Sequence, residues 1–204
     1  MHGDARQRVA TRGCQQAMDE MTSERGAFAQ LVAMLYVEAC YELFAAHGLT
    51  VCIEDRAVRR ADTRGGSAVS MLLLTGKSIR LSSALRIDNT VLAGTHPAAG
   101  HPGMPLDLED WCREFSNQLG GRLKNRLLRL GCEVMLDLAT LITGNDVSLI
   151  DPPDWEVQKW TFTSAGGDTL AKLAMQLDPA FRVSELQVAP GDEATLAEGT
   201  HLLF

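Results

Sequence analysis

Apolar residues recur at helical spacing in two long stretches. The first covers Ala27–His47, and Gly48 follows it where a left-handed helix cap is wanted. The second covers Leu108–Leu130, with Asp107 as the expected N-cap and Gly131 as the stop. Both patterns predict long helices that bury one face.

Shorter stretches alternate between apolar and polar residues, as strands do. The clearest pair is Trp155–Thr163 and Asp168–Leu177, which Ser164-Ala165-Gly166-Gly167 would join as a hairpin. We expect further strands over Leu49–Glu54, Ala68–Leu74, Ile79–Ile87 and Cys132–Leu138, with Phe181–Val188 as a candidate addition. The end of the third of these, toward Leu92, fits a strand or a short helix, and Leu141–Asn145 is expected to turn outward. Two long helices against a sheet built largely of hairpins give an α+β, two-layer architecture.

The periodicity weakens at both ends of the 204-residue chain, whose length suits one domain. Residues 1–25 are polar and are expected to form a flexible N-terminal segment. The domain is expected over residues 26–189, and a C-terminal tail over 190–204. Loops are expected at Asp62–Gly66, at Gly94–Pro105, which holds three prolines, and at Asp151–Asp154.

Charge and cysteine content narrow the function. The net charge of −7 and the pI near 5.2 argue against nucleic acid or an anionic membrane as partner, since both attract clustered Lys and Arg. Five scattered cysteines without a C-x-x-C pair favour reduced thiols over disulfides or structural zinc. The polar start lacks a signal-peptide pattern, and the apolar stretch Phe28–Ala46 contains two glutamates, so we expect a cytoplasmic protein with a core helix there.

The second predicted helix combines an acid, an amide and a glycine on one face. At roughly 100° per residue, Glu114 and Asn117 lie about 60° apart, with Gly121 between them in azimuth. All three point away from the apolar stripe of Phe115 and Leu119. A glycine lets another surface approach a helix closely, although each mid-helix glycine costs about 1 kcal/mol relative to alanine.

The segment Glu114-Phe115-Ser116-Asn117-Gln118-Leu119-Gly120-Gly121-Arg122-Leu123-Lys124-Asn125 resembles the motif helix of the CheX and CheC chemotaxis phosphatases. That family carries Glu-x-x-Asn on a long helix, followed by a small or glycine-containing turn. The order of elements also matches over residues 27–178. The resemblance implies a CheC-like fold, with two long helices on a largely antiparallel sheet.

By this resemblance the substrate is the aspartyl phosphate of a response-regulator receiver domain of the CheY type. Glu114 would accept a hydrogen bond from a receiver lysine, and Asn117 would orient the attacking water. Gln118, Gly121 and Lys124 would contact the receiver. The chain would need no cofactor or metal of its own, because Mg²⁺ would belong to the receiver.

Two departures from the family pattern stand out. CheC-type proteins carry a second Glu-x-x-Asn on the first helix, but here Tyr41 follows Glu38 at that spacing and Ala45 follows Glu42. A single motif makes the CheX-like branch the nearer match, and that branch implies a homodimer joined through sheet edges. Members also often have a proline where this chain has Ala139.

Three functions remain open. The first is the phosphatase; the second is a CheX-like binding module that docks a receiver or another signalling protein without turnover; the third is a structural partner, as in the related flagellar switch components. Other chemistry is weakly indicated. His96 and His101 lie in a Pro/Gly loop without an acid or cysteine at ligand spacing, and Ser82-Ser83 lacks a Gly-x-Ser-x-Gly context.

Overall fold

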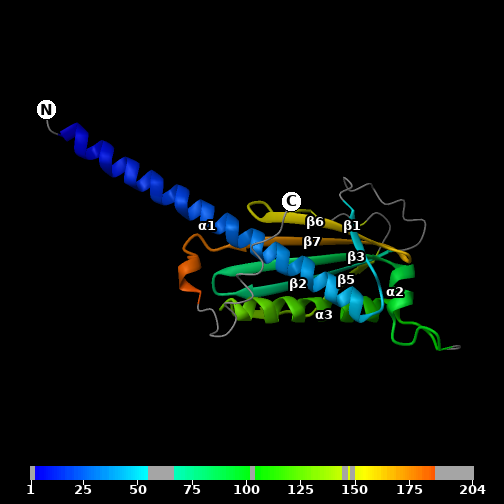
Figure 1. Ribbon diagram of the computed structural model, residues 1–204. Helices are drawn as coiled ribbons and strands as arrows, with labels where there is room; N and C mark the ends of the chain where they lie inside the picture. Colours follow the sequence, from blue (N-terminus) through cyan, green and yellow to red (C-terminus); the bar gives the residue numbers. More distant parts are fainter. Residues whose placement is uncertain (1–2, 55–66, 102–103, 144–146, 148–149, 187–204) are drawn as a thin grey trace.

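The computed structural model describes residues 3–54, 67–101, 104–143, 147 and 150–186, with backbone alone up to Thr22. Figure 1 shows two long helices lying against one sheet, with a short helix at one end of it. In chain order the elements are α1 (Gly3–Ala46), β1 (Cys52–Glu54), β2 (Ser67–Gly76), β3 (Ile79–Asp88), α2 (Asn89–Thr95), α3 (Leu108–Arg129), β4 (Val134–Leu136), β5 (Thr140–Thr143), β6 (Glu156–Ser164), β7 (Gly167–Leu177) and the 3₁₀ helix η1 (Val183–Glu185).

The sheet has seven strands in the order β1-β6-β7-β3-β2-β4, and β5 also pairs with β2. Each of these pairings is antiparallel. The hairpins β2–β3 and β6–β7 meet at the β3–β7 ladder, which runs from Ile79↔Leu177 to Ile87↔Thr169. The expected hairpin of the two last strands and the expected α+β class are therefore confirmed.

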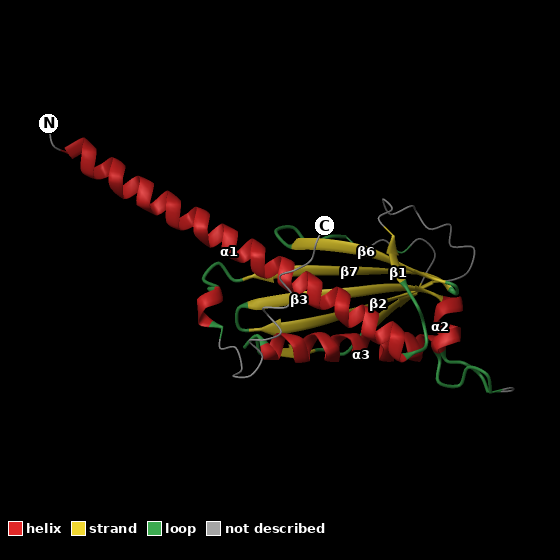
Figure 2. Cartoon of the chain, viewed as in Figure 1, coloured by secondary structure: helices red, strands yellow, loops and turns green. Residues whose placement is uncertain are grey.

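α1 and α3 pack on the same face of the sheet and form the second layer (Figure 2). Their contact is apolar at its centre: the Phe44 ring lies 5.7 Å from that of Phe115 and 5.3 Å from that of Phe162 on β6. One stretch among the described residues, Ser23–Ala46, is long and apolar enough to span a membrane, but half of its apolar window is buried in this fold. It is a core helix, as predicted.

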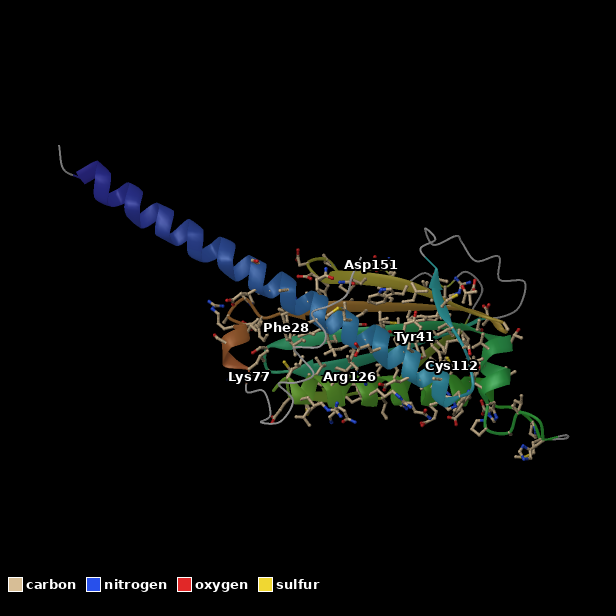
Figure 3. All side chains as sticks on the ribbon, in the orientation of Figure 1. Phe28, Tyr41, Lys77, Cys112, Arg126 and Asp151 are labelled. Atoms are coloured by element: carbon tan, nitrogen blue, oxygen red, sulfur yellow. The ribbon has the colours of Figure 1, made fainter. Side chains whose placement is uncertain are left out.

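A charged contact closes the outer side of the α1–α3 interface (Figure 3). The Arg126 Nη2 atom lies 2.5 Å from Glu42 Oε1, and Arg126 Nε lies 3.9 Å from Glu38 Oε2. The Arg126 side chain is only 14% exposed. Glu38 and Glu42 stand at the positions compared above with the second motif of CheC-type proteins. In this chain both acids join α1 to α3.

Four sequence predictions differ from the structure. The first helix begins at Gly3 rather than near Ala27, because the earlier residues include many good helix formers and no proline. Thr140–Thr143 does not turn outward but pairs with β2, and the strand expected over Cys132–Leu138 shortens to β4. The candidate strand over Phe181–Val188 is not formed in its described part, up to Leu186, where Val183–Glu185 is the 3₁₀ helix η1. Both edges of β7 are already paired, and the Phe181 ring packs 4.8 Å from that of Phe28 on α1.

The ends of α3 agree with the sequence prediction. Asp107 Oδ1 accepts a hydrogen bond of 2.9 Å from the Asp110 N–H, and Gly131 follows the helix with φ of 77°. The sequence left open whether the segment from Ile87 toward Leu92 is a strand or a short helix. The structure has the short helix α2 there. The expected loop at Asp62–Gly66 and the expected tail over 190–204 lie outside the described residues, and the domain limits at residues 26 and 189 stay predictions.

Candidate functional site

α3 presents a polar ridge to solvent along the face opposite its core stripe. Its apolar side chains are buried against α1 and the sheet: Trp111, Cys112, Phe115, Leu119, Leu123 and Leu127. Glu114 is exposed, and Asn117, Gln118, Gly121 and Lys124 are partly exposed. The five residues predicted for the site therefore share one accessible face of one helix; we call them the α3 ridge.

Glu114 is held by a neighbour one turn further along the helix. Gln118 Nε2 donates a hydrogen bond of 3.1 Å to Glu114 Oε1. At its other end, Gln118 Oε1 lies 3.0 Å from Nε2 of His47, the residue that follows α1. We expected Gln118 to bind the partner. In the structure both the oxygen and the nitrogen of its side-chain amide make contacts within the chain.

Asn117 is held from the other side, by the segment between β4 and β5. The backbone N–H of Ala139 donates to Asn117 Oδ1 at 3.3 Å. Among the described residues the Asn117 Nδ2 group has no hydrogen-bond partner, so the amide keeps its two donors and one lone pair of Oδ1 for other groups. The departure from the family pattern is what permits this contact, since a proline at position 139 would lack the N–H.

The adjacent glycines of α3 have different surroundings. A Cβ on Gly120 would lie 2.2 Å from Leu72 Cδ2 and 2.7 Å from Leu136 Cδ1, so this glycine lets α3 approach the sheet. A Cβ on Gly121 would meet nothing within 4 Å. Packing within the chain thus accounts for Gly120, whereas nothing in the described structure accounts for Gly121.

We predict opposite stability changes for the two glycines. Gly120→Ala is expected to lower the free energy of unfolding by about 1–3 kcal/mol, because the new methyl overpacks the contact with Leu72 and Leu136. Gly121→Ala is expected to raise it by about 1 kcal/mol, the gain in helix propensity. Urea unfolding curves would measure both changes from the shift of the midpoint, provided that the slope of the unfolding free energy against urea is the same in each variant. Equal effects of the two substitutions would contradict this account.

Lys124 lies one turn beyond Gly121, at the edge of a groove of about 500 Å³. The groove separates the C-terminal half of α3 from the β2–β3 turn and β4, and it is lined by Thr75, Gly76, Lys77, Lys124, Leu128, Glu133, Val134 and Met135. Leu128 and Met135 are exposed there, at 52% and 73%. Lys124 therefore belongs to the ridge but extends it toward a partly apolar surface.

Asp151 forms a separate charged cluster on β6 and β7 (Figure 3). Lys159 Nζ donates to Asp151 Oδ2 at 2.8 Å, and Lys172 Nζ contacts Oδ1. The hydrogen bonds from Lys159 and Lys172 hold the pKa of Asp151 below its usual value. The two lysines face each other across the strands, where like charges repel, so Asp151 acts as their counterion and fastens the segment before β6 to the sheet.

Thiol and histidine chemistry finds little support elsewhere. Cys40, Cys52, Cys112 and Cys132 are free thiols, and burial raises the pKa of both Cys112 and Cys132 to about 11. A thiol with a raised pKa is a poor nucleophile. His96 Nδ1 accepts from the Ala98 N–H, as expected of a structural loop histidine, and His101 is exposed.

Sequence reasoning missed two contributors to the site, His47 and Ala139. His47 ends the first helical stretch and lies 71 positions from Gln118. Ala139 was noted only because it replaces a proline, and its contribution is a backbone N–H that any other residue except proline also carries. Neither pattern nor spacing encodes such long-range contacts.

Comparison with known proteins gives the fold a precedent. No protein-family model matches the chain, and no curated protein matches it significantly. Solved structures do. The chemotaxis protein CheX from Desulfovibrio desulfuricans matches with a TM-score of 0.59 at 14% identity, over 71% of this chain and 99% of that one. CheX from Vibrio vulnificus matches with a TM-score of 0.58 at 12% identity, over 70% and 97%.

A third neighbour was solved with a partner. CheX of Borrelia burgdorferi, in a CheX–CheY–BeF₃–Mg²⁺ complex, matches with a TM-score of 0.54 at 12% identity, over 71% of this chain and 97% of that one. At such identities these likenesses establish the fold. The CheC-like architecture expected from the sequence is confirmed.

Proposed function

We propose that this protein is a phosphatase for the aspartyl phosphate of a receiver domain, in the manner of CheX. The observation that carries the proposal is the α3 ridge, on which an exposed carboxylate and a partly exposed carboxamide stand one turn apart. Gln118 of the same helix holds the carboxylate of Glu114 by a hydrogen bond, and the backbone N–H of Ala139 holds the amide of Asn117. Gly121 leaves open space beside them for a docked surface. The match to a CheX solved together with CheY supports a receiver as the partner.

The proposed chemistry relies on positioning. An aspartyl phosphate is an acyl phosphate and is already reactive, so holding water in line supplies much of the barrier reduction. Asn117 Oδ1 would accept a hydrogen bond from that water through its second lone pair, which leaves the water oxygen directed at phosphorus. The new P–O bond forms as the bond to the aspartyl oxygen breaks, releasing inorganic phosphate and the free carboxylate.

Charge explains why an amide suits this position. A carboxylate in place of Asn117 would repel the anionic phosphoryl group, whereas a carboxamide is neutral. Glu114 carries the negative charge one turn away, where it would accept a charged hydrogen bond from a receiver lysine. Mg²⁺ would be bound by the receiver.

A cytoplasmic location and a homodimer joined through sheet edges belong to the same proposal. Sedimentation velocity would measure whether the protein is a dimer.

The decisive experiment follows phosphate loss from several radiolabelled CheY-type receivers, with and without the wild-type protein. Acceleration at catalytic amounts supports the phosphatase. A receiver that binds in its BeF₃⁻-activated form, but loses phosphate at its own rate, would make this a binding module. No binding to any receiver would leave the structural-partner reading.

Ala139→Pro tests whether the backbone contact to Asn117 matters for turnover. Removing the 3.3 Å hydrogen bond is expected to lower kcat about two- to tenfold, the range of one neutral hydrogen bond, with receiver affinity unchanged. Ala139→Ser keeps the N–H and serves as the matched control. Unchanged kcat in Ala139→Pro, with phosphatase activity present in the wild type, would show that Asn117 needs no such anchor.

A further inference from the structure

A chain of side chains links the end of α1 to the carboxylate of the α3 ridge. His47 Nε2 lies 3.0 Å from Gln118 Oε1, and Gln118 Nε2 lies 3.1 Å from Glu114 Oε1. Gln118 therefore bridges two helices that meet at this end of the fold. Of these three residues Glu114 alone is exposed, whereas His47 and Gln118 are partly exposed.

The chemistry of the groups fixes which atom donates at each link. An ionised carboxylate only accepts hydrogen bonds, so the Gln118 amide must turn its NH₂ toward Glu114. Its carbonyl oxygen then faces His47 and can only accept. The His47 ring must consequently carry its proton on Nε2, and rotating the amide by half a turn would set two acceptors against each other at Glu114.

The His47 ring is a suitable fixed point because aromatic side chains enclose it. Its centroid lies 5.1 Å from that of Trp111 in an edge-to-face arrangement and 5.3 Å from that of Phe115. The His47 N–H also bonds to the Phe44 carbonyl at 3.1 Å, just before Gly48 ends the turn with φ of 74°. By contrast, long side chains such as those of Glu114 and Gln118 lose considerable rotamer freedom when they are ordered.

We propose that His47 is a positioning residue that orients Glu114 through Gln118 for its contact with a receiver. The inference rests on the proposed function. His47 does not touch the partner in this scheme; it fixes the amide, and the amide fixes the carboxylate before binding. Such preorganisation lowers the ordering cost of association. It therefore acts on affinity, and not on the water that Asn117 orients.

Two substitutions at His47 separate the donor from the bulk of the ring. Glutamine places an amide N–H at about the reach of Nε2, whereas asparagine reaches only as far as Nδ1. Both remove the aromatic ring. We expect His47→Asn to weaken binding of BeF₃⁻-activated receiver about three- to tenfold, and His47→Gln to stay close to the wild type. The kcat at saturating receiver is expected to be unchanged in both variants.

A double-mutant cycle checks that the effect passes through Gln118. Gln118→Ala is expected to weaken binding as much as His47→Asn, and the double variant no further. In a Glu114→Ala background both substitutions are expected to have no effect. Additive losses would overturn the inference, because they would mean that His47 and Gln118 act separately.

Nitrogen-15 NMR of the histidine ring tests the link without any receiver. The wild type is expected to show the proton on Nε2, with slowed solvent exchange that Gln118→Ala restores to a fast rate. A ring protonated on Nδ1 alone would overturn the inference, as would wild-type affinity in His47→Asn. Failure of the wild type to bind any receiver would instead overturn the proposed function. The NMR result would then still report the hydrogen bond between His47 and Gln118, because it needs no receiver.

Discussion

Asn117→Ala is expected to lower the rate at which a phosphorylated receiver is dephosphorylated by about 10²-fold, while the affinity for the receiver stays nearly unchanged. This magnitude is typical of losing one group that is aimed at the reacting centre. The amide is held at Oδ1 by the Ala139 N–H, and it is only partly exposed, so its loss should not disturb the core. Single-turnover phosphate release at saturating enzyme would measure the effect directly.

Asn125→Ala provides the matched control for this experiment. Asn125 lies two turns further along α3 and is exposed, so the same side chain is removed from the same helix. We expect wild-type turnover in this variant. If Asn117→Ala also retained the wild-type rate, another group would have to position the water, and the assignment of Asn117 would be wrong.

Glu114→Ala is expected to weaken receiver binding about 10- to 100-fold. A hydrogen bond between ionised partners contributes about 1.5–3 kcal/mol, more than a neutral one, once docking excludes water from it. The rate at saturating receiver should change much less than the affinity. Fluorescence anisotropy with a labelled, BeF₃⁻-activated receiver gives the dissociation constant, and the difference from the wild type should shrink as salt is added.

Glu109→Ala controls for the loss of one negative charge from α3. Glu109 is exposed in the first turn of the helix and lies 3.9 Å from Arg113, away from the ridge. We expect receiver affinity within about twofold of the wild type, the scale of an exposed ion pair. Equal losses for Glu109→Ala and Glu114→Ala would indicate general electrostatic attraction and contradict a specific contact at Glu114.

Local chemistry made much of this architecture predictable. The Asp107 cap and Gly131 stop bounded α3, the two-residue period gave the β6–β7 hairpin, and helical geometry alone put Glu114 and Asn117 on one face. These features depend on neighbours within a few positions. The resemblance in the α3 segment then indicated the fold that the structure shows.

What escaped prediction depends on tertiary contacts. The contact between His47 and Gln118 needs the end of α1 to meet α3, and the packing of Phe181 depends on Phe28, far away in sequence. The early part of α1 is helical although its residues show no apolar period, because that pattern reports burial and not backbone conformation.

The contact of Arg126 with Glu38 and Glu42 also sets how many partners one molecule can hold. In the described part of the chain Glu38 and Glu42 of α1 are both engaged with Arg126 of α3, which leaves the Glu114–Asn117 pair of the α3 ridge as the acid–amide pair available to a partner. Each chain would then have a valence of one. Titration with a receiver should saturate at one per chain along a simple hyperbola, and any steeper response in the cell would have to come from several chains acting together.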